Sequence, residues 1–326
     1  MRNRFFAGLL TAALVDPDLV LITADLGFGA VDEFVAARPG QFLNAGVAEQ
    51  NMAGLAAGIA LGGGRVFTYS IANFPTLRCL EQIRNDICYH QADVTVVAVG
   101  GGLAYGALGM SHHATEDLAI MRALPGMAVA APGDPAEVDA VLDDLLTSGG
   151  PAYLRLGKTG EPSVHPGPVS APRGTSLLLN SAGLPLNSAG SGGGEILLCS
   201  TGAILDVTCR AADLLTSGGI RADVRSFPWL DPFDTAAIRE AAAQYAAIVT
   251  VEEHSIVGGL GSAVAEVLAE TAAGVPLIRV ALPNQSSSVV GDQDFLRGAY
   301  GLDPESISRR VRDHWEAHRG LASQVR

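Results

Sequence analysis

The sequence predicts an α/β protein with two doubly wound domains. Apolar runs of strand length alternate with helical patterns over residues 1–160, a stretch rich in Pro, Gly and Ser follows, and the alternation resumes over residues 195–326. The strands read as continuous apolar runs, which is typical of parallel sheets that helices cover on both faces. A chain of 326 residues has room for about two domains of ordinary size.

The first element is a helix, and the strands of the first domain follow it. "MRNRFFAGLLTAALV" has a basic start and an apolar middle, as a short signal peptide has. Its apolar residues nevertheless fall near one face of a helix: Phe5, Leu9, Leu10 and Ala13. We therefore expect an ordinary first helix. Strands are expected at 19–25, 65–70, 94–100, 127–132 and 152–157.

Residues 161–194 are predicted to be an interdomain linker, because "GEPSVHPGPVSAPRG" and "LNSAGSGGGE" are rich in Pro, Gly and Ser. In the second domain, strands are expected at "EILLCS", "ADVRSF", "AIVTVEEH" and "PLIRVAL". "VGGLGSAVAEVL" lacks the third glycine of a dinucleotide fingerprint, so we expect a tight strand-to-helix turn there.

Charge and cysteine content exclude several classes of protein. A formal net charge of −13 without a long basic run argues against nucleic acid as a partner, because an acidic chain repels phosphate backbones. No apolar run reaches the roughly 20 residues that span a bilayer, so we expect no membrane partner. The four cysteines show no C-x-x-C spacing, which favours reduced thiols in a cytoplasmic protein and predicts no metal ligands.

Glu49 stands just before a run of small and apolar residues, "QNMAGLAAGIALGG". Gly54, Gly58 and Gly62 recur every fourth residue, at a cost of roughly 1 kcal/mol each within a helix. One smooth helical face of this kind implies the close approach of another backbone, within the domain or across a subunit boundary. From position alone, Glu49 is either a carboxylate stabilised by the helix dipole or an acid with a function.

Three segments carry a resemblance to a known family. "NAGVAEQNMAGLAAGIALGGGRVFTYS" resembles the pyrimidine-binding domain of transketolases, and "GALGMSHHATEDLAIMRALPGMAVAAPGDPAE" resembles their substrate loop. "IVTVEEHSIVGGLGSAV" is similar to the C-terminal domain shared by transketolases, deoxyxylulose-phosphate synthases and 2-oxoacid dehydrogenase beta subunits. The resemblance implies a thiamine diphosphate-binding (pyrimidine domain) fold followed by a transketolase C-terminal domain.

The resemblance gives Glu49 a function. The equivalent glutamate of the family hydrogen-bonds a ring nitrogen of the aminopyrimidine of thiamine diphosphate, which activates the coenzyme for attack on a ketose carbonyl. Such a carboxyl group must hold its proton near neutral pH, so we expect apolar surroundings for Glu49. The implied reaction transfers a two-carbon ketol unit from a ketose or ketose phosphate to an aldehyde or ketone.

Other cofactor-binding residues follow from the same resemblance. The family stacks aromatic rings on the aminopyrimidine, and Tyr69 and Phe74 are the expected rings here, whereas Phe67 is expected in the core. Asp25 in "TADLG" matches an aspartate near the coenzyme, and a turn residue at a strand end is the plain alternative.

Substrate contacts are implied in the second half of this domain. His112 matches the histidine that contacts the donor hydroxyls, and His113 is expected to point elsewhere. Lys158 falls where relatives bind the substrate phosphate, and Arg155 on the same strand end could contribute; a surface pair that binds nothing is the alternative. The two carboxylates after the histidines are expected to cap the next helix: Glu116 and Asp117.

Two departures from the family bear on the substrate. Leu108 stands where transketolases commonly have an acidic residue, and "GGG" at 100–102 stands where they have a histidine. Because a carboxylate there would bind a substrate hydroxyl, its replacement suggests a less polar or unusual acceptor.

No Gly-Asp-Gly motif, which would bind the metal of the diphosphate, occurs in the sequence. The chain therefore resembles the C-terminal half of a transketolase made as a separate subunit. We expect a partner subunit that holds the diphosphate and Mg²⁺, an α₂β₂ assembly, and an active site between the subunits. The alternatives are a 2-oxoacid dehydrogenase beta subunit and a non-catalytic scaffold subunit.

Overall fold

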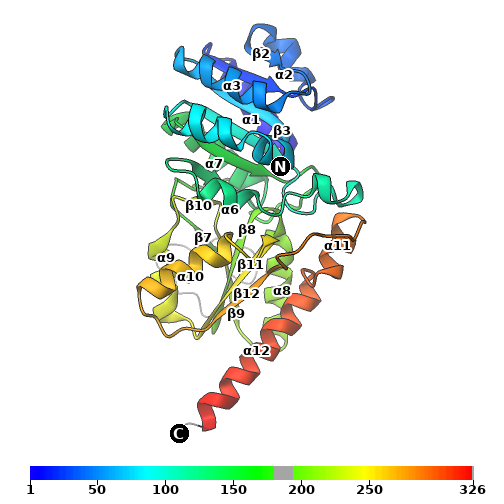
Figure 1. Ribbon diagram of the computed structural model, residues 1–326. Coiled ribbons are helices and arrows are strands. Elements are labelled where there is room, and N and C mark those ends of the chain that lie inside the picture. The colour runs from blue at the N-terminus through cyan, green and yellow to red at the C-terminus, as the bar shows by residue number, and fades with distance from the viewer. Residues whose placement is uncertain (180–193, 325–326) are drawn as a thin grey trace.

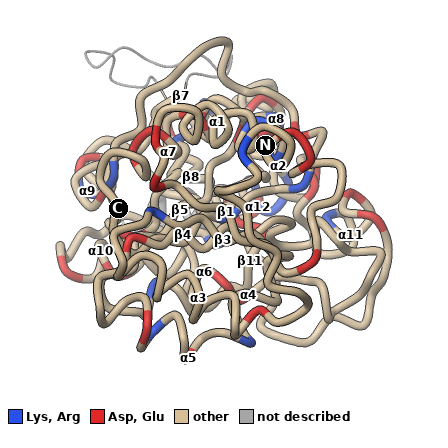
Figure 2. Tube along the Cα trace, turned by 90° about the horizontal axis from the view of Figure 1, so that it is seen from above, with Lys and Arg blue, Asp and Glu red and all other residues tan. Residues whose placement is uncertain are grey.

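The computed structural model describes residues 1–179 and 194–324 of the chain. Two α/β domains lie one above the other, and the last helix extends away from the second domain (Figure 1). Within the described residues, no helix is both long and apolar enough to cross a bilayer. Seen from above, acidic and basic residues are interspersed around the chain (Figure 2).

The first domain contains a seven-stranded sheet in the order β10-β5-β6-β4-β3-β1-β2. All pairs are parallel except β10, which runs antiparallel to β5. The five expected strands are present, so the doubly wound first domain is confirmed. The strands are β1 (Leu19–Thr23), β2 (Phe42–Asn44), β3 (Arg65–Ile71), β4 (Val94–Val99), β5 (Ala128–Ala130), β6 (Ala152–Leu156) and β10 (Trp229–Asp231).

Helices cover both faces of this sheet. The expected first helix forms, and it packs with α7 over one face while α3, α4, α5 and a π-helical turn cover the other. The helical elements are α1 (Arg2–Ala13), α2 (Asp32–Ala37), η1 (Pro39–Gln41), α3 (Glu49–Leu61), α4 (Asn73–Leu77), α5 (Leu80–Gln82), η2 (Ile83–Cys88), η3 (Gly106–Leu108), η4 (Met110–His112), α6 (Asp117–Arg122) and α7 (Pro135–Ser148).

The second domain has a five-stranded sheet in the order β12-β11-β8-β9-β7, in which only the pairing of β7 is antiparallel. Helices α9 and α10 lie on one face, and α8 and α12 lie on the other (Figure 1). The elements are β7 (Leu177–Leu179), β8 (Ile196–Thr201), η5 (Gly202–Ile204), α8 (Leu205–Ser217), β9 (Ala222–Ser226), α9 (Thr235–Gln244), β11 (Ala247–Ser255), α10 (Leu260–Glu270), β12 (Leu277–Leu282), α11 (Gln293–Ala299) and α12 (Pro304–Gln324).

The segment predicted as a linker, 161–194, is packed against the domains wherever the structure describes it. Ala171 is buried and its carbonyl accepts a hydrogen bond from Trp229 Nε1 at 2.8 Å. His165 is buried between Asp134 and Glu137 of the first domain. The segment then pairs as β7 with the second sheet, so it packs against both domains instead of spanning the space between them; residues 180–193 lie outside the described part.

Candidate functional site

The predicted site residues follow successive parallel strands of the first sheet. Asp25 comes after β1, Glu49 after β2, Phe74 after β3, His112 after β4 and Lys158 after β6. Because all these strands run in the same direction, the residues gather at one edge of the sheet. In open α/β sheets, ligands bind at the carboxyl ends of the strands.

Glu49 is the first residue of α3 and is 4% exposed. Its Oε2 accepts a hydrogen bond of 3.0 Å from Nη1 of Arg78, whose side chain is 52% exposed. The acid is thus buried, but its surroundings are less apolar than expected, since a guanidinium reaches it from the solvent side. Burial, with the nearby charge of Glu49, raises the pKa of the Cys79 thiol to about 12, which keeps this thiol protonated.

The turn that leads to Glu49 is held by two strand-end residues. Asn44 Nδ2 donates to Asp25 Oδ1 at 2.9 Å, and the backbone N of Asp25 donates to Asn44 Oδ1 at 3.0 Å. The same amide oxygen accepts from the backbone N of Gly46 at 2.9 Å. Asp25 has φ 55°, a left-handed backbone common at turns. Asp25 thus fixes the ends of β1 and β2 relative to each other; its contact with a coenzyme stays a prediction.

Arg78, Phe74 and His112 connect Glu49 with the substrate loop. The Arg78 guanidinium carbon lies 4.3 Å from the centre of the Phe74 ring. The rings of Phe74 and His112 meet edge to face, with centres 5.2 Å apart. Asn73 Nδ2 donates to the backbone oxygen of Ser111 at 2.8 Å, which ties α4 to the loop. The buried acid and the half-buried imidazole therefore belong to one continuous site, in which Arg78 was not predicted.

Tyr69 does not offer its ring to a ligand, so its assignment as a stacking residue is corrected. It is 1% exposed and packs against Phe6 with ring centres 4.8 Å apart. Burial raises the pKa of its hydroxyl. This side of β3 faces α1, which places Tyr69 in the core beside Phe67, as expected for the latter. Phe74, which is half-buried, remains the candidate for stacking.

Arg155 is likewise corrected, from a substrate contact to a buried joint between the domains. It is 5% exposed, and its Nη2 donates to the carbonyls of Ala114 at 2.8 Å and Glu253 at 2.9 Å. Its Nε lies 3.2 Å from Asp117 Oδ2, which also accepts from the Tyr153 hydroxyl at 2.7 Å. Asp117 does lie in the first turn of α6, but its partners are these two side chains and not the helix amides.

The glycine triplet at 100–102 leaves the space that Arg155 and Glu253 occupy between the domains. A Cβ on Gly101 would overlap the Arg155 side chain, and one on Gly102 would overlap Glu253. Gly102 has φ 65° and pairs with Ala114 through two backbone hydrogen bonds. A histidine has no room at this position, because the second domain and Arg155 occupy the space it would need.

The "EEHS" sequence at the end of β11 fastens the second domain to the loop that bears His112. Glu253 accepts hydrogen bonds from the backbone N of Leu103 at 2.6 Å and from the side chains of Gln293 and Arg297. His254 Nε2 accepts from the backbone N of Ala119 in α6 at 3.3 Å. Burial lowers the pKa of His254 to about 4, so the ring is neutral at neutral pH.

Glu252 has a different role from its two neighbours. Its carboxylate accepts from the backbone N of Leu260 at 2.7 Å and of Gly261 at 2.8 Å, at the start of α10. Burial raises its pKa to about 7, because the surroundings disfavour the charged form. The glycines of this segment thus form the expected strand-to-helix turn.

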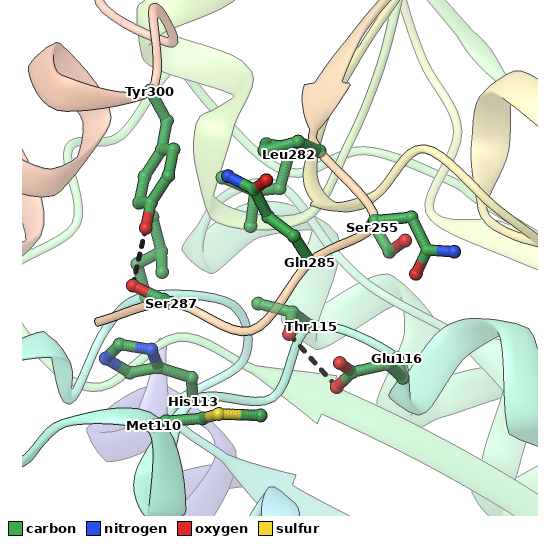
Figure 3. A pocket seen from close by; sticks show the side chains of 12 residues that line it. Met110, His113, Thr115, Glu116, Ser255, Leu282, Gln285, Ser287 and Tyr300 are labelled. Carbon is green, nitrogen blue, oxygen red and sulfur yellow. Dashed lines mark hydrogen bonds between the residues drawn. The ribbon is translucent and has the colours of Figure 1, made fainter. Parts of the chain in front are cut away.

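His113 faces a different environment from His112, as expected. It is buried, and its Nε2 lies 3.3 Å from the carbonyl of Gly106. Figure 3 shows it in a pocket between the two domains, together with Ser287 and Tyr300, whose hydroxyls are hydrogen-bonded. Glu116 lines the same pocket and accepts from the Thr115 hydroxyl, so its side chain does not cap α6.

Lys158 is half-buried and lines another interdomain cavity, of about 430 Å³. Arg210 and Arg297 line it as well, and each is paired with an acid. The predicted phosphate contact of Lys158 stays a prediction. Among the residues with described side chains, no group of three or more His, Cys, Asp or Glu is placed to hold a metal ion.

The glycine face of α3 points outward. Gly54 and Gly58 are exposed, and a Cβ on either would meet nothing within 4 Å. Gly62 is the C-cap of the helix and no part of this face. No backbone within the described chain approaches these glycines, so the alternative of close packing inside the domain is wrong.

Comparisons with known proteins agree with this architecture. Residues 1–161 match the family described as transketolase, pyrimidine binding domain, and residues 189–307 match transketolase, C-terminal domain. One of the subunits of an apulose-4-phosphate transketolase from Phocaeicola vulgatus is 34% identical over 309 residues, which cover 94% of this chain and 95% of the relative. A 6-deoxy-6-sulfo-D-fructose transketolase subunit of a Clostridium species is 33% identical over 96% of this chain and 94% of the relative.

A solved structure shows the same fold. It is described as a split gene transketolase in an inactive β4 tetramer, is 33% identical, and has a TM-score of 0.83 over 96% of each chain. These similarities confirm the prediction that the chain corresponds to the C-terminal half of a transketolase made as a separate subunit. They favour it over the 2-oxoacid dehydrogenase alternative. The chain belongs to the transketolase family, as a pyrimidine-binding domain followed by the C-terminal domain.

Proposed function

We propose that this chain is the C-terminal subunit of a two-component transketolase that depends on thiamine diphosphate. The observation that carries the proposal is the continuous site at the carboxyl edge of the first sheet. There a buried acid, Glu49, lies beside Arg78 and the Phe74 ring, and His112 contacts the same ring. This arrangement joins a proton-holding group to a group that can bind sugar hydroxyls.

The residues present fit one end of the coenzyme. Glu49 offers a carboxyl group to a ring nitrogen, and the half-buried Phe74 offers a ring for stacking. Bound thiamine diphosphate supplies the carbon nucleophile that takes up a two-carbon unit. Neither a Gly-Asp-Gly motif in the sequence nor a metal-ligand cluster in the described chain is available for the diphosphate. The partner subunit is therefore proposed to hold the diphosphate and Mg²⁺.

This chain's own residues then have separate roles. Glu49 holds a proton at the pyrimidine nitrogen, as a buried general acid does. Phe74 orients the ring and excludes water from it. His112 hydrogen-bonds the hydroxyls of the sugar, and the joint through Arg155 and Glu253 fixes the loop that carries it.

Exposed apolar side chains lie at this edge and along α3, which runs from it towards the opposite edge of the sheet, and they indicate where the partner binds. Contiguous apolar surface is uncommon on monomers and marks interaction sites. The outward glycines of α3 allow a close approach in the same region, and α3, α4 and α5 line one rim of the domain (Figure 2). We propose that the partner subunit covers these side chains in an α₂β₂ assembly: Phe28, Val47, Leu55, Leu61, Leu77 and Leu108.

The relatives suggest the class of substrate. Apulose 4-phosphate and 6-deoxy-6-sulfo-D-fructose are both ketoses with an anionic group, and we propose an anionic ketose as donor here. Lys158 would bind the anionic end. Leu108, which is exposed, favours an acceptor with fewer hydroxyls than ribose 5-phosphate. A cytoplasmic location is proposed because the four cysteines are free thiols.

Reconstitution tests the proposal. The purified chain, an N-terminal transketolase subunit from the same organism, and their mixture are each supplied with thiamine diphosphate and Mg²⁺. Ketol transfer from the two named ketoses to ribose 5-phosphate and to less hydroxylated acceptors is measured. We expect transfer from the mixture alone. Transfer by this chain alone would contradict the division of the coenzyme site, and no transfer from a stable complex would favour a scaffold subunit.

A further inference from the structure

Arg78 contacts both side chains that the coenzyme would need, those of Glu49 and Phe74. Its Nη1 donates to Glu49 Oε2 at 3.0 Å, and its guanidinium lies 4.3 Å from the centre of the Phe74 ring. A guanidinium is planar, carries N–H donors in its plane, and stacks on aromatic rings. An aminopyrimidine bound through Glu49 and Phe74 would make the same two kinds of contact. Arg78 therefore has the shape and chemistry to take its place.

We propose that Arg78 is a positioning residue that stands in for the aminopyrimidine while the subunit is free and gives way when the coenzyme binds. The inference rests on the proposed function and extends it to the unassembled subunit. It explains how a carboxylate with 5% exposure is kept paired before any coenzyme is present. An unpaired charge at such a position would be strongly unfavourable.

The contacts of Arg78 suit a replaceable group. Its side chain is 52% exposed, so water can solvate the guanidinium after it leaves Glu49. Half-exposed ion pairs are weak because water screens them. Arg155, by contrast, is a buried arginine in the same domain and bonds two backbone carbonyls, so it cannot leave without exposing them. Within this site, Arg78 is thus held to the acid by contacts that a ligand can replace.

Retaining Arg78 at Glu49 would also hinder the proposed chemistry. A guanidinium offers only donors, so while it is bound it occupies the Glu49 oxygen that would otherwise meet the ring nitrogen. The proposed role of Glu49 needs the carboxyl group to share a proton with a ring nitrogen. Removal of Arg78 from the acid therefore accompanies binding of the coenzyme, and binding must work against the ion pair.

Coenzyme affinity measures this competition directly. Thiamine diphosphate binding to the reconstituted two-subunit complex is followed by calorimetry in Mg²⁺ buffer, for wild type and for Arg78→Met. Arg84→Met is the matched control, because Arg84 is exposed and its side chain donates to the adjacent Asn85, away from Glu49 and Phe74. Arg78→Ala serves as a second variant, since a methionine could itself cover the Phe74 ring.

We expect both Arg78 variants to bind the coenzyme about five- to tenfold more tightly than wild type, because an ion pair and a cation–π contact no longer have to be broken. The Arg84 variant should bind as wild type does. Unchanged or weaker binding in both Arg78 variants would overturn the inference while leaving the proposed function intact. If wild type and all variants fail to bind the coenzyme, the proposed function itself is wrong, and the inference falls with it.

Discussion

Replacing Arg155 by methionine tests whether the joint between the domains has the energetic role that its contacts imply. Methionine keeps most of the aliphatic length but removes the guanidinium. Asp117, which is 2% exposed, then loses its cationic partner, and the carbonyls of Ala114 and Glu253 lose a shared donor. Removing one partner of a buried ion pair typically costs about 3–5 kcal/mol, because the other charge stays buried.

We therefore expect Arg155→Met to lower the free energy of unfolding by about 3–5 kcal/mol, measured by urea denaturation with circular dichroism. Hydrogen exchange should also become faster at the backbone amides of Gly102 and Ala114, which pair with each other next to the lost donor. The control is Arg221→Met, whose side chain is 67% exposed and lies 3.9 Å from its acidic neighbour. Surface changes of this kind fall within about 0.5 kcal/mol. A loss below about 1 kcal/mol in Arg155→Met, with unchanged exchange, would refute the reasoning.

Two further predictions concern pH and assembly. The pKa of His254 is lowered by burial to about 4, below its ordinary 6.5, so its stability contribution is present above pH 6.5 and lost as the pH falls towards 4. The free energy of unfolding of wild type, measured with urea, should fall by about 1.6 kcal/mol relative to that of His254→Gln between pH 6.5 and 5, and parallel pH curves would contradict this. Gly58→Leu should leave the free chain as stable or more stable but weaken partner binding at least tenfold by calorimetry, whereas Gly298→Leu, a helical glycine with equally open space in the second domain, should not. Equal partner affinity in both leucine variants would place the interface elsewhere.

The central strands of both sheets could be predicted from the sequence because burial on both faces leaves a local signal, a continuous apolar run. The short strands β7 and β10 leave none. Each has three residues, and each forms only because a strand from another part of the chain offers an antiparallel edge. The Pro-rich segment before β7 resembles a spacer for the same reason, since its packing partners lie far away in the sequence.

The site residues were predictable as a set but less so one by one. The order of strands brings Asp25, Glu49, Phe74 and His112 to one edge, which the α/β pattern implies. Tyr69 lies on the core side of β3, and in a strand buried on both sides the sequence does not distinguish the two faces.

Arg155 carries a signal in the sequence that points to its structural role. An arginine within the otherwise apolar "AYLRL" of β6 is buried only when it is paired. Arg78, in contrast, follows α4 without any distinctive spacing. Its link to Glu49 depends on how α4 packs beside α3, a tertiary contact that no local pattern records.

The most direct test of the account is the exchange rate of the thiazolium C2 proton of thiamine diphosphate in the reconstituted complex. Deuterium exchange, quenched and read by NMR, is compared between wild type, Glu49→Gln and Glu33→Gln, a control at an exposed first-turn glutamate of α2. Glu49→Gln should slow the exchange by about 100-fold or more, and Glu33→Gln should not change it. Exchange as fast in Glu49→Gln as in wild type would show that this buried acid does not activate the coenzyme.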